Sequence, residues 1–271
     1  MLFKKLAVVV LATISSLAQA SIFVGTGANT GDLLRIDSTT GTVTTIKLAA
    51  IPGENGAAGV GAAYDAAHAK LYVRTFVNLY TASLTDGSLS LVGPNDFAGV
   101  LPTALTFSDA ALYGLERFAQ NRVFTVSTTN GALSSVGVTG LIGDSWVGLA
   151  TKSDGTLYGA TVGGSIYTLS KLDGTATLVK SAVAGPDGLS EIEFDDADQL
   201  FGVGLTSNRL LKIDLVAGNS TFVGAAALVA SDSIRGLTLI SAPVPEPASW
   251  ALMAAGLVFA ARAARRCAKR E

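Results

Sequence analysis

Carboxylates are the residues of this sequence that could most readily perform chemistry. Five of them lie close together in the segment EIEFDDAD: Glu191, Glu193, Asp195, Asp196 and Asp198. Carboxylate oxygens can bind calcium, which takes six to eight oxygen ligands, and two carboxylates suffice to hydrolyse a glycosidic bond. The segment lacks the spaced Asp-x-Asp-x-Asp-Gly pattern of a calcium loop and is not repeated elsewhere. We therefore expect it to form a solvated turn.

Other residues of catalytic type are scarce. His68, in DAAHAKLY, is the only histidine, and Cys267, near the C-terminus, is the only cysteine. A metal site of imidazole type needs a second histidine, and no Gly-x-Ser-x-Gly segment supplies a nucleophilic serine. We expect His68 to lie on a surface turn, and we predict no catalytic residue, no metal and no cofactor.

The elements that position these groups are repeated along the chain. Five copies of a two-strand phrase surround a turn glycine, at Gly41, Gly87, Gly131, Gly174 and Gly218, so that successive copies are 43 to 46 residues apart. Apolar residues recur at fixed offsets from each glycine, for example at Leu34, Tyr80, Phe124, Tyr167 and Leu211. Alternating residues around Asp-Gly and Asn-Gly pairs predict hairpins. At Asn130-Gly131 we expect a type I′ turn.

Each full copy holds two further strands before this hairpin, the second of them containing an aromatic residue as in LYG at Tyr113 and Tyr158. Four strands in about 44 residues are typical of a β-propeller blade. A β-sandwich is a less suitable alternative because it would not keep these offsets through five copies, and a β-solenoid because its rungs are normally shorter and more regular. The repeated aromatic residues are expected in the core, whereas Trp146 has no counterpart and is expected at the mouth of the ring.

The two ends of the repeated region predict how the ring closes. The first copy, from Ile22, lacks its opening strand, while Gly236 to Ile240 (GLTLI) matches an opening strand with nothing after it. Pairing these segments would complete a fifth blade and remove the exposed edges of an open array. The fold class is therefore all-β: a five-bladed propeller over residues 21–240, closed by its N- and C-terminal strands.

Composition and the N-terminus indicate export. Only 15% of the residues are charged, and between Ser21 and Pro247 there are 12 Lys and Arg against 20 Asp and Glu, which argues against nucleic acid as a partner. Residues 1–20 have the three parts of a secretory signal: a positive start, an apolar middle and a small-residue site at Ala18 and Ala20. A retained anchor is the alternative. We expect signal peptidase to cleave before Ser21.

The C-terminus has three parts of its own. Residues 241–247 form a Pro-rich linker, and residues 248–271 contain a short apolar segment, for which we predict a transmembrane-type helix, followed by basic residues. The basic residues are Arg262, Arg265, Arg266, Lys269 and Arg270. They would stay in the cytoplasm as a stop, leaving the body outside.

This terminus resembles the PEP-CTERM sorting signal of Gram-negative bacteria. The resemblance rests on Val244, Pro245, Glu246 and Pro247, the apolar segment and the basic end. It implies processing by an exosortase, a membrane protease, and implies transient anchoring in the inner membrane before transfer to the cell surface or medium. Proteins with this signal are typically surface or secreted proteins of bacteria that build exopolysaccharide and biofilm matrix.

Two functions follow as hypotheses. The first is a non-enzymatic exported propeller with a binding or structural role toward exopolysaccharide or another surface protein. The alternative is an extracytoplasmic hydrolase, glycosidase-like or lactonase-like, using carboxylates at the channel mouth. A propeller that keeps its tail and is never processed is a third possibility. Two carboxylates converging within ~10 Å in the central channel would favour the hydrolase.

Overall fold

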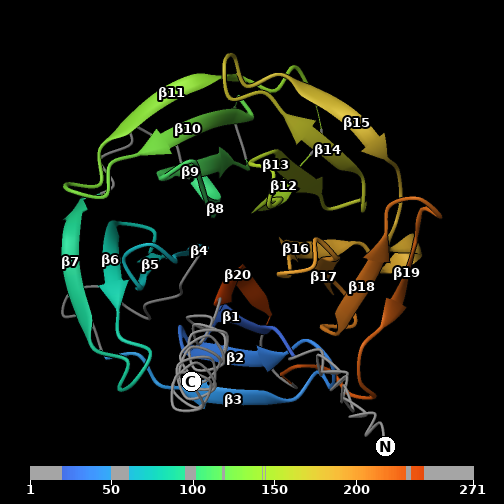
Figure 1. Ribbon diagram of the computed structural model, residues 1–271, viewed down its shortest axis with the longest axis horizontal. Coiled ribbons are helices and arrows are strands. Elements are labelled where there is room, and N and C mark those ends of the chain that lie inside the picture. Colours follow the sequence, from blue (N-terminus) through green and yellow to red (C-terminus); the bar gives the residue numbers. More distant parts are fainter. Residues whose placement is uncertain are drawn as a thin grey trace, which may run out of the picture.

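The computed structural model describes residues 20–49, 61–94, 102–117, 120–141, 143, 145–229 and 233–240. They form five antiparallel sheets of four strands each, arranged as blades around a central axis (Figure 1). The predicted signal sequence, the Pro-rich linker and the predicted C-terminal helix lie outside these residues, apart from residue 20. Among the described residues no helix is long and apolar enough to cross a membrane.

The strands of each blade run in chain order from the centre outward, except in the first blade. The first blade contains β20 (Ile234–Ile240), β1 (Ile22–Gly27), β2 (Leu33–Asp37) and β3 (Val43–Ile46). The second contains β4 (Gly61–Asp65), β5 (Lys70–Arg74), β6 (Asn78–Ala82) and β7 (Leu89–Pro94). The third contains β8 (Pro102–Ser108), β9 (Ala111–Glu116), β10 (Arg122–Val126) and β11 (Leu133–Val138).

The remaining two blades follow the same order. The fourth contains β12 (Trp146–Thr151), β13 (Leu157–Thr161), β14 (Ile166–Leu169) and β15 (Ala176–Lys180). The fifth contains β16 (Leu189–Phe194), β17 (Leu200–Gly204), β18 (Leu210–Asp214) and β19 (Asn219–Phe222). A single turn of 3₁₀ helix, η1 (Gly185–Asp187), precedes β16.

The ring closes through its two ends, as the sequence predicts. Strand β20 pairs antiparallel with β1, with Ile240 opposite Ile22 and Leu239 opposite Phe23. Strand β20 therefore becomes the innermost strand of the first blade, where it packs between β16 and β4. Pairing of this kind leaves no blade with an open inner edge. The prediction of a five-bladed propeller is confirmed.

The core lies between the blades. Each of the five apolar clusters among the described residues joins two neighbouring blades, as where Phe23 of β1 meets Phe201 of β17 with their ring centroids 5.2 Å apart. The repeated aromatic residues Tyr72, Tyr80, Tyr113 and Phe201 are buried, as expected. Because each apolar cluster lies between two adjacent blades, the fixed spacing in the sequence becomes one repeated interface.

The turn glycines have the expected left-handed backbone, but the turn type at Asn130-Gly131 was predicted wrongly. Gly131 has a φ of +74°, whereas Asn130 is not among the residues with positive φ, which a type I′ turn requires. Instead the Gly131 N–H donates to the carbonyl of Ser127 at 2.8 Å, four residues earlier. The same hydrogen bond closes the turns at Gly41, Gly87, Gly174 and Gly218.

Candidate functional site at the two mouths of the channel

The inner strands β4, β8, β12, β16 and β20 surround the axis, and one of them carries two charged residues. Glu191 and Glu193 lie on β16, at positions where β20 has Gly236 and Thr238. They alternate with Ile192 and Phe194, which pack into the core shared with the fourth blade. Since side chains alternate along a strand, both glutamates point to the other side, toward β20.

Glu191 is 2% exposed, and its Oε1 accepts a hydrogen bond of 2.8 Å from the Gly236 N–H. Burial raises the pKa of this carboxyl well above its ordinary value, although the nearby cations of Arg235 and Arg117 oppose the shift. Gly236 can approach β4 closely because it has no side chain: a Cβ there would overlap the backbone of Ala62 and Gly61. Glu191 therefore ties β16 to the strand that closes the ring.

Glu193 makes a similar connection further along the strand. It is 5% exposed and accepts a 2.9 Å hydrogen bond from the Phe194 N–H, together with hydrogen bonds from the Leu239 N–H and the Thr238 hydroxyl. Burial raises the pKa of Glu193 to about 8, against the effect of these donors. At neutral pH the carboxyl is therefore mostly protonated, which removes the free-energy cost of an ion in the interior.

The two glutamates open to opposite mouths. Glu193 lines a cavity of about 450 Å³ at the carboxyl ends of the inner strands, whereas Glu191 lines a cavity of about 40 Å³ at their amino ends. Two residues apart on one strand, their Cα atoms are separated by roughly 7 Å, a distance at which paired carboxylates can act in glycosidases. They cannot act on one substrate, however, because each faces a different cavity.

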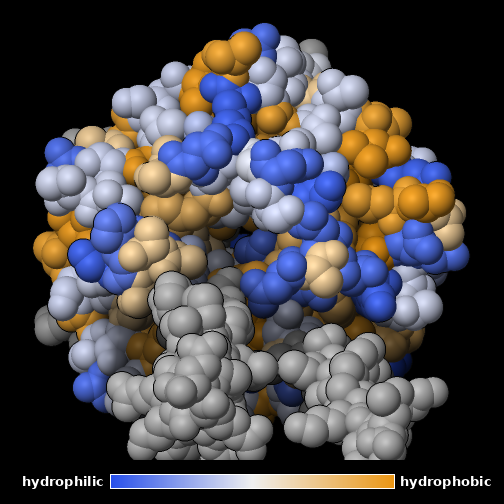
Figure 2. Space-filling model, in the orientation of Figure 1, coloured by the Kyte–Doolittle hydropathy of each residue, from blue (hydrophilic) through white to orange (hydrophobic). Residues whose placement is uncertain are grey.

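The larger cavity combines three kinds of group. Aromatic rings come from Tyr64, Phe107 and Phe194, and Ser or Thr hydroxyls come from three of the inner strands, including Thr106 and Thr238. Carboxyl groups complete the lining, from Asp65, Asp109, Glu193, Asp195 and Asp196. Figure 2 shows a face of the ring on which hydrophilic residues predominate around the recessed centre, while apolar residues lie mostly toward the rim.

The acidic segment that the sequence singled out is divided between two environments. The expectation of a solvated turn is wrong for Glu191 and Glu193, which are buried because the inner strand extends to Phe194. The three aspartates do lie on the β16–β17 turn. Asp195 accepts hydrogen bonds from the N–H groups of Ala197 and Gln199, at 2.9 and 2.8 Å, and thereby shapes that turn.

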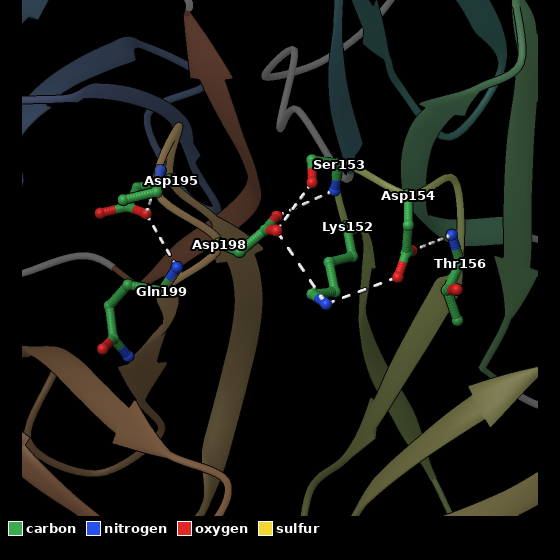
Figure 3. A network of polar contacts seen from close by, with 8 residues as sticks. Lys152, Ser153, Asp154, Thr156, Asp195, Asp198 and Gln199 are labelled. Carbon is green, nitrogen blue, oxygen red and sulfur yellow. Dashed lines mark hydrogen bonds and ion pairs between the residues drawn. The ribbon is translucent and has the colours of Figure 1, made fainter.

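Asp198 joins this turn to the next blade (Figure 3). Its carboxylate accepts hydrogen bonds from the N–H and the hydroxyl of Ser153, at 2.9 and 2.7 Å, and these hydrogen bonds lower its pKa. Lys152 lies 4.0 Å from Asp198 and 3.4 Å from Asp154. Asp198 and Asp154 therefore already have partners among the turns at the edge of the ring. Within the described residues, no three His, Cys, Asp or Glu side chains are grouped so that they could hold a metal ion.

His68 and Trp146 lie in different surroundings. The side chain of His68 is 68% exposed, and its Nδ1 lies 2.7 Å from Asp65, which agrees with the predicted surface turn. The expectation that Trp146 lies at the mouth is wrong. Trp146 begins β12, is fully buried and packs edge-on against Tyr167 at 5.3 Å. It fills the space above Gly159.

Sequence reasoning missed the basic residues of the smaller mouth, Arg117 and Arg235. They lie where the chain enters or leaves the inner and second strands, outside any recognisable motif. The contrast with the other inner strands becomes visible once each inner strand is superposed through its pairing with the second strand of its blade. The other four then have Gly, Ala or Thr where Glu191 and Glu193 stand, at Gly61 and Ala63, Ala104 and Thr106, Gly148 and Ala150, and Gly236 and Thr238. A glutamate at a position where the other inner strands have a small residue indicates a contact that the other blades do not make.

Comparison with known proteins supports the C-terminal resemblance and the fold. Residues 243–266 match the PEP-CTERM protein-sorting motif. A comparison with curated protein sequences finds no match. Among solved structures, the chain is similar to one from the nidogen/laminin complex, with 14% identity, a TM-score of 0.55 and coverage of 81% of this chain and 98% of that one.

It is also similar to a gluconolactonase from Xanthomonas campestris, with 14% identity, a TM-score of 0.51 and coverage of 83% and 85%. At such identities the likeness concerns the fold alone, which serves an enzyme in one case and belongs to a protein complex in the other. The sorting motif carries more information. The protein is exported, held transiently in the membrane, processed by exosortase and released to the cell surface.

Proposed function

We propose that the exported ring is a non-enzymatic binding protein of the cell surface or matrix, and that its ligand is a carbohydrate held in the larger cavity. The observation that carries this proposal is the cavity itself, of about 450 Å³, in which aromatic rings, hydroxyls and carboxylates converge from all five blades. Its volume lies within the roughly 300–1,000 Å³ typical of small-molecule sites.

The chemistry of the lining suits a sugar. Carboxylates accept hydrogen bonds from sugar hydroxyls, and Ser and Thr hydroxyls both donate and accept them. The partly exposed rings of Tyr64 and Phe107 offer apolar faces for C–H groups. A positively charged or metal-bound ligand is less well supported, because Asp65, Asp109 and Asp195 are already engaged by His68, Lys171 and backbone N–H groups. Exopolysaccharide of the producing cell is the natural candidate after sorting to the surface.

A hydrolase remains the second candidate, and one specific observation favours it. Glu193, whose pKa is raised to about 8, opens to the same cavity as the exposed aspartates of the rim, and such a difference in environment can create an acid and a base. Against this, the Glu193 carboxyl already accepts hydrogen bonds from Phe194, Leu239 and Thr238. A group held by three donors of its own fold is poorly placed to transfer a proton to a substrate.

Titration of oligosaccharides against the exported protein tests the binding proposal. With a panel of neutral and uronate-containing oligosaccharides, we expect saturable binding that Tyr64→Leu weakens by about tenfold, since loss of an aromatic contact costs roughly 1 kcal/mol or more. Phe222→Leu is the matched control, because Phe222 is a half-exposed aromatic residue on the outermost strand of the fifth blade. Equal affinities for both variants and the parent would contradict the assignment of the site.

A further inference from the structure

The smaller mouth of the channel has a character opposite to that of the larger one. Its cavity of about 40 Å³ is lined by Arg117, Arg235, Ser190, Ser233 and Glu191, with Val147 and Leu205. Arg117 directly follows β9 and Arg235 lies near the start of β20, so the two arginines come from different blades. A water-sized cavity needs only about 10–15 Å³, which leaves this one room for a small group of atoms.

The two guanidinium groups are close enough to repel each other. Burial lowers the pKa of Arg117, and the charge of Arg235 lowers it further, whereas Glu191 acts in the opposite direction. The Arg117 Nε donates to the Ser145 hydroxyl at 3.2 Å, which fixes the direction of its guanidinium. A pair of like charges that the fold holds around one cavity is stabilised when an anion enters between them.

The acids that the structure describes near this mouth offset the charge only in part. Glu191 accepts the Gly236 N–H at 2.8 Å inside the protein, and its burial favours the neutral acid. Glu116, which precedes Arg117, forms an ion pair with Arg122, with 3.2 Å between its Oε2 and the Arg122 Nε. A third arginine, Arg74, ends β5 at the same end of the ring, opposite Gly61. Within the part of the chain that the structure describes, the amino-end mouth is therefore basic.

We infer that this mouth binds a small oxyanion between the guanidinium groups of Arg117 and Arg235. Guanidinium groups present several N–H donors in a plane that matches carboxylate and phosphate oxygens, and such hydrogen bonds are strong. The volume admits one carboxylate or phosphate group and no sugar ring, so the ligand is a free anion or the anionic group of a larger molecule at the mouth. This site is separate from the carbohydrate site of the other mouth.

Calorimetric titration of the exported, processed protein at constant ionic strength in chloride tests the inference. Inorganic phosphate, acetate and glucuronate are the probes: they separate a phosphate preference from a carboxylate preference, and a free anion from one attached to a sugar. We expect saturable binding of at least one probe with a stoichiometry of one. Arg117→Gln and Arg235→Gln should each weaken it by about tenfold or more, since hydrogen bonds to charged groups contribute most to affinity.

Arg35→Gln is the matched control, because it removes the same charge from an exposed position on β2. It should leave the affinity within about twofold of the parent. Arg235→Lys keeps the charge and tests the planar donor geometry; it should bind more weakly than the parent and more tightly than Arg235→Gln. The absence of saturable binding by all three probes, or equal loss in the Arg35 variant, would overturn the site.

Discussion

Glu191 and Glu193 do structural work that their residue type would not suggest. Both lie inside the ring and both accept N–H groups of β20, the strand that closes it. Burial raises both pKa values, so that each carboxyl is favoured in its neutral form. A neutral carboxyl can bridge two strands by hydrogen bonds without the desolvation cost of a charge.

The shifted pKa of Glu193 predicts how stability depends on pH. The folded pKa, about 8, lies above the unfolded value near 4.5, so the stabilising contribution is fully present below the unfolded pKa and is lost as pH rises toward 8. Urea unfolding should show a free energy that falls by on the order of 3 kcal/mol between pH 5 and 8 because of this residue.

Glu193→Gln should remove this part of the slope, because an amide does not titrate, while the part that comes from Glu191 remains. Asp196→Asn, which changes an exposed carboxylate on the adjoining turn, should leave the slope as it is. If the Gln variant kept the full slope, Glu193 would be ionised in the folded protein, and its role as a neutral bridge would be wrong.

Individual residues could be placed from the sequence only where neighbouring residues in the chain determine their surroundings. The surface turn at His68 was predictable because a polar segment separated two apolar ones. The burial of Glu191 and Glu193 was not, because a dense acidic segment is usually solvated, and the inner strand is recognised only when all copies are aligned. The burial of Trp146 was not predictable either, because it depends on a residue of another strand: Gly159 of β13 leaves room for the indole.

At the scale of the element, the repeated turn has two requirements that only glycine meets. The first is a positive φ, found at all five turn glycines. The second is close contact with the preceding blade: a Cβ at Gly87 would overlap the carbonyl oxygen of Lys47, and one at Gly131 would lie 3.2 Å from the carbonyl oxygen of Gly93. Each turn is therefore also part of the interface between blades.

Two glycine substitutions separate these requirements. Gly140 also has a positive φ, +78°, but no described atom lies within 4 Å of a Cβ placed there. We expect Gly140→Ala to cost about 1 kcal/mol, from backbone strain alone. Gly87→Ala should cost about 3 kcal/mol or more, because the backbone of the neighbouring blade must also move. Thermal or urea unfolding of both variants measures the difference, and equal costs would mean that the turn does not contribute to blade packing.

In the turns, the sequence predicted the position of each hairpin but not the geometry of its turn. Alternation and spacing predicted the hairpins and the turn glycines, because both depend on residues within one copy. The type I′ geometry at Asn130-Gly131 was predicted from a dipeptide, whereas the structure uses a longer turn that starts at Ser127. There the Ser127 hydroxyl accepts the N–H groups of Thr129 and Asn130, at 3.3 and 3.4 Å, and Asp37 and Asp214 do the same in their own turns.

At the scale of the whole molecule, the two strands that close the ring end beside the larger cavity, close to the start of the sorting motif. Ile22, the first residue of β1, lies opposite Ile240, the last residue of β20, and Thr238 and Leu239 line the larger cavity. The chain enters and leaves the ring beside that cavity, and the sorting motif begins three residues after Ile240. Closure could be predicted from an unpaired strand, whereas the cavity could not, because its lining comes from the ends of all five blades.

Processing of the exported protein can be followed by its mass. We expect a mature chain that begins at Ser21 and has lost the basic residues from Arg262 onward, since the motif is read by a membrane protease. Intact-mass measurement of the surface or released protein, compared with the form that accumulates in a strain without the exosortase, measures this. A surface protein that still ends at Glu271 would indicate an unprocessed anchor.

The central claim is that the larger cavity binds a carbohydrate without transforming it. The most direct measurement incubates the exported protein with an oligosaccharide that binds it, at equimolar concentration and for many hours, and then determines the mass of the recovered sugar. We expect the oligosaccharide to be retained by the protein and recovered intact, for the parent and for Glu193→Gln alike. Shortened or hydrolysed products from the parent, absent with Glu193→Gln, would contradict it and establish the hydrolase.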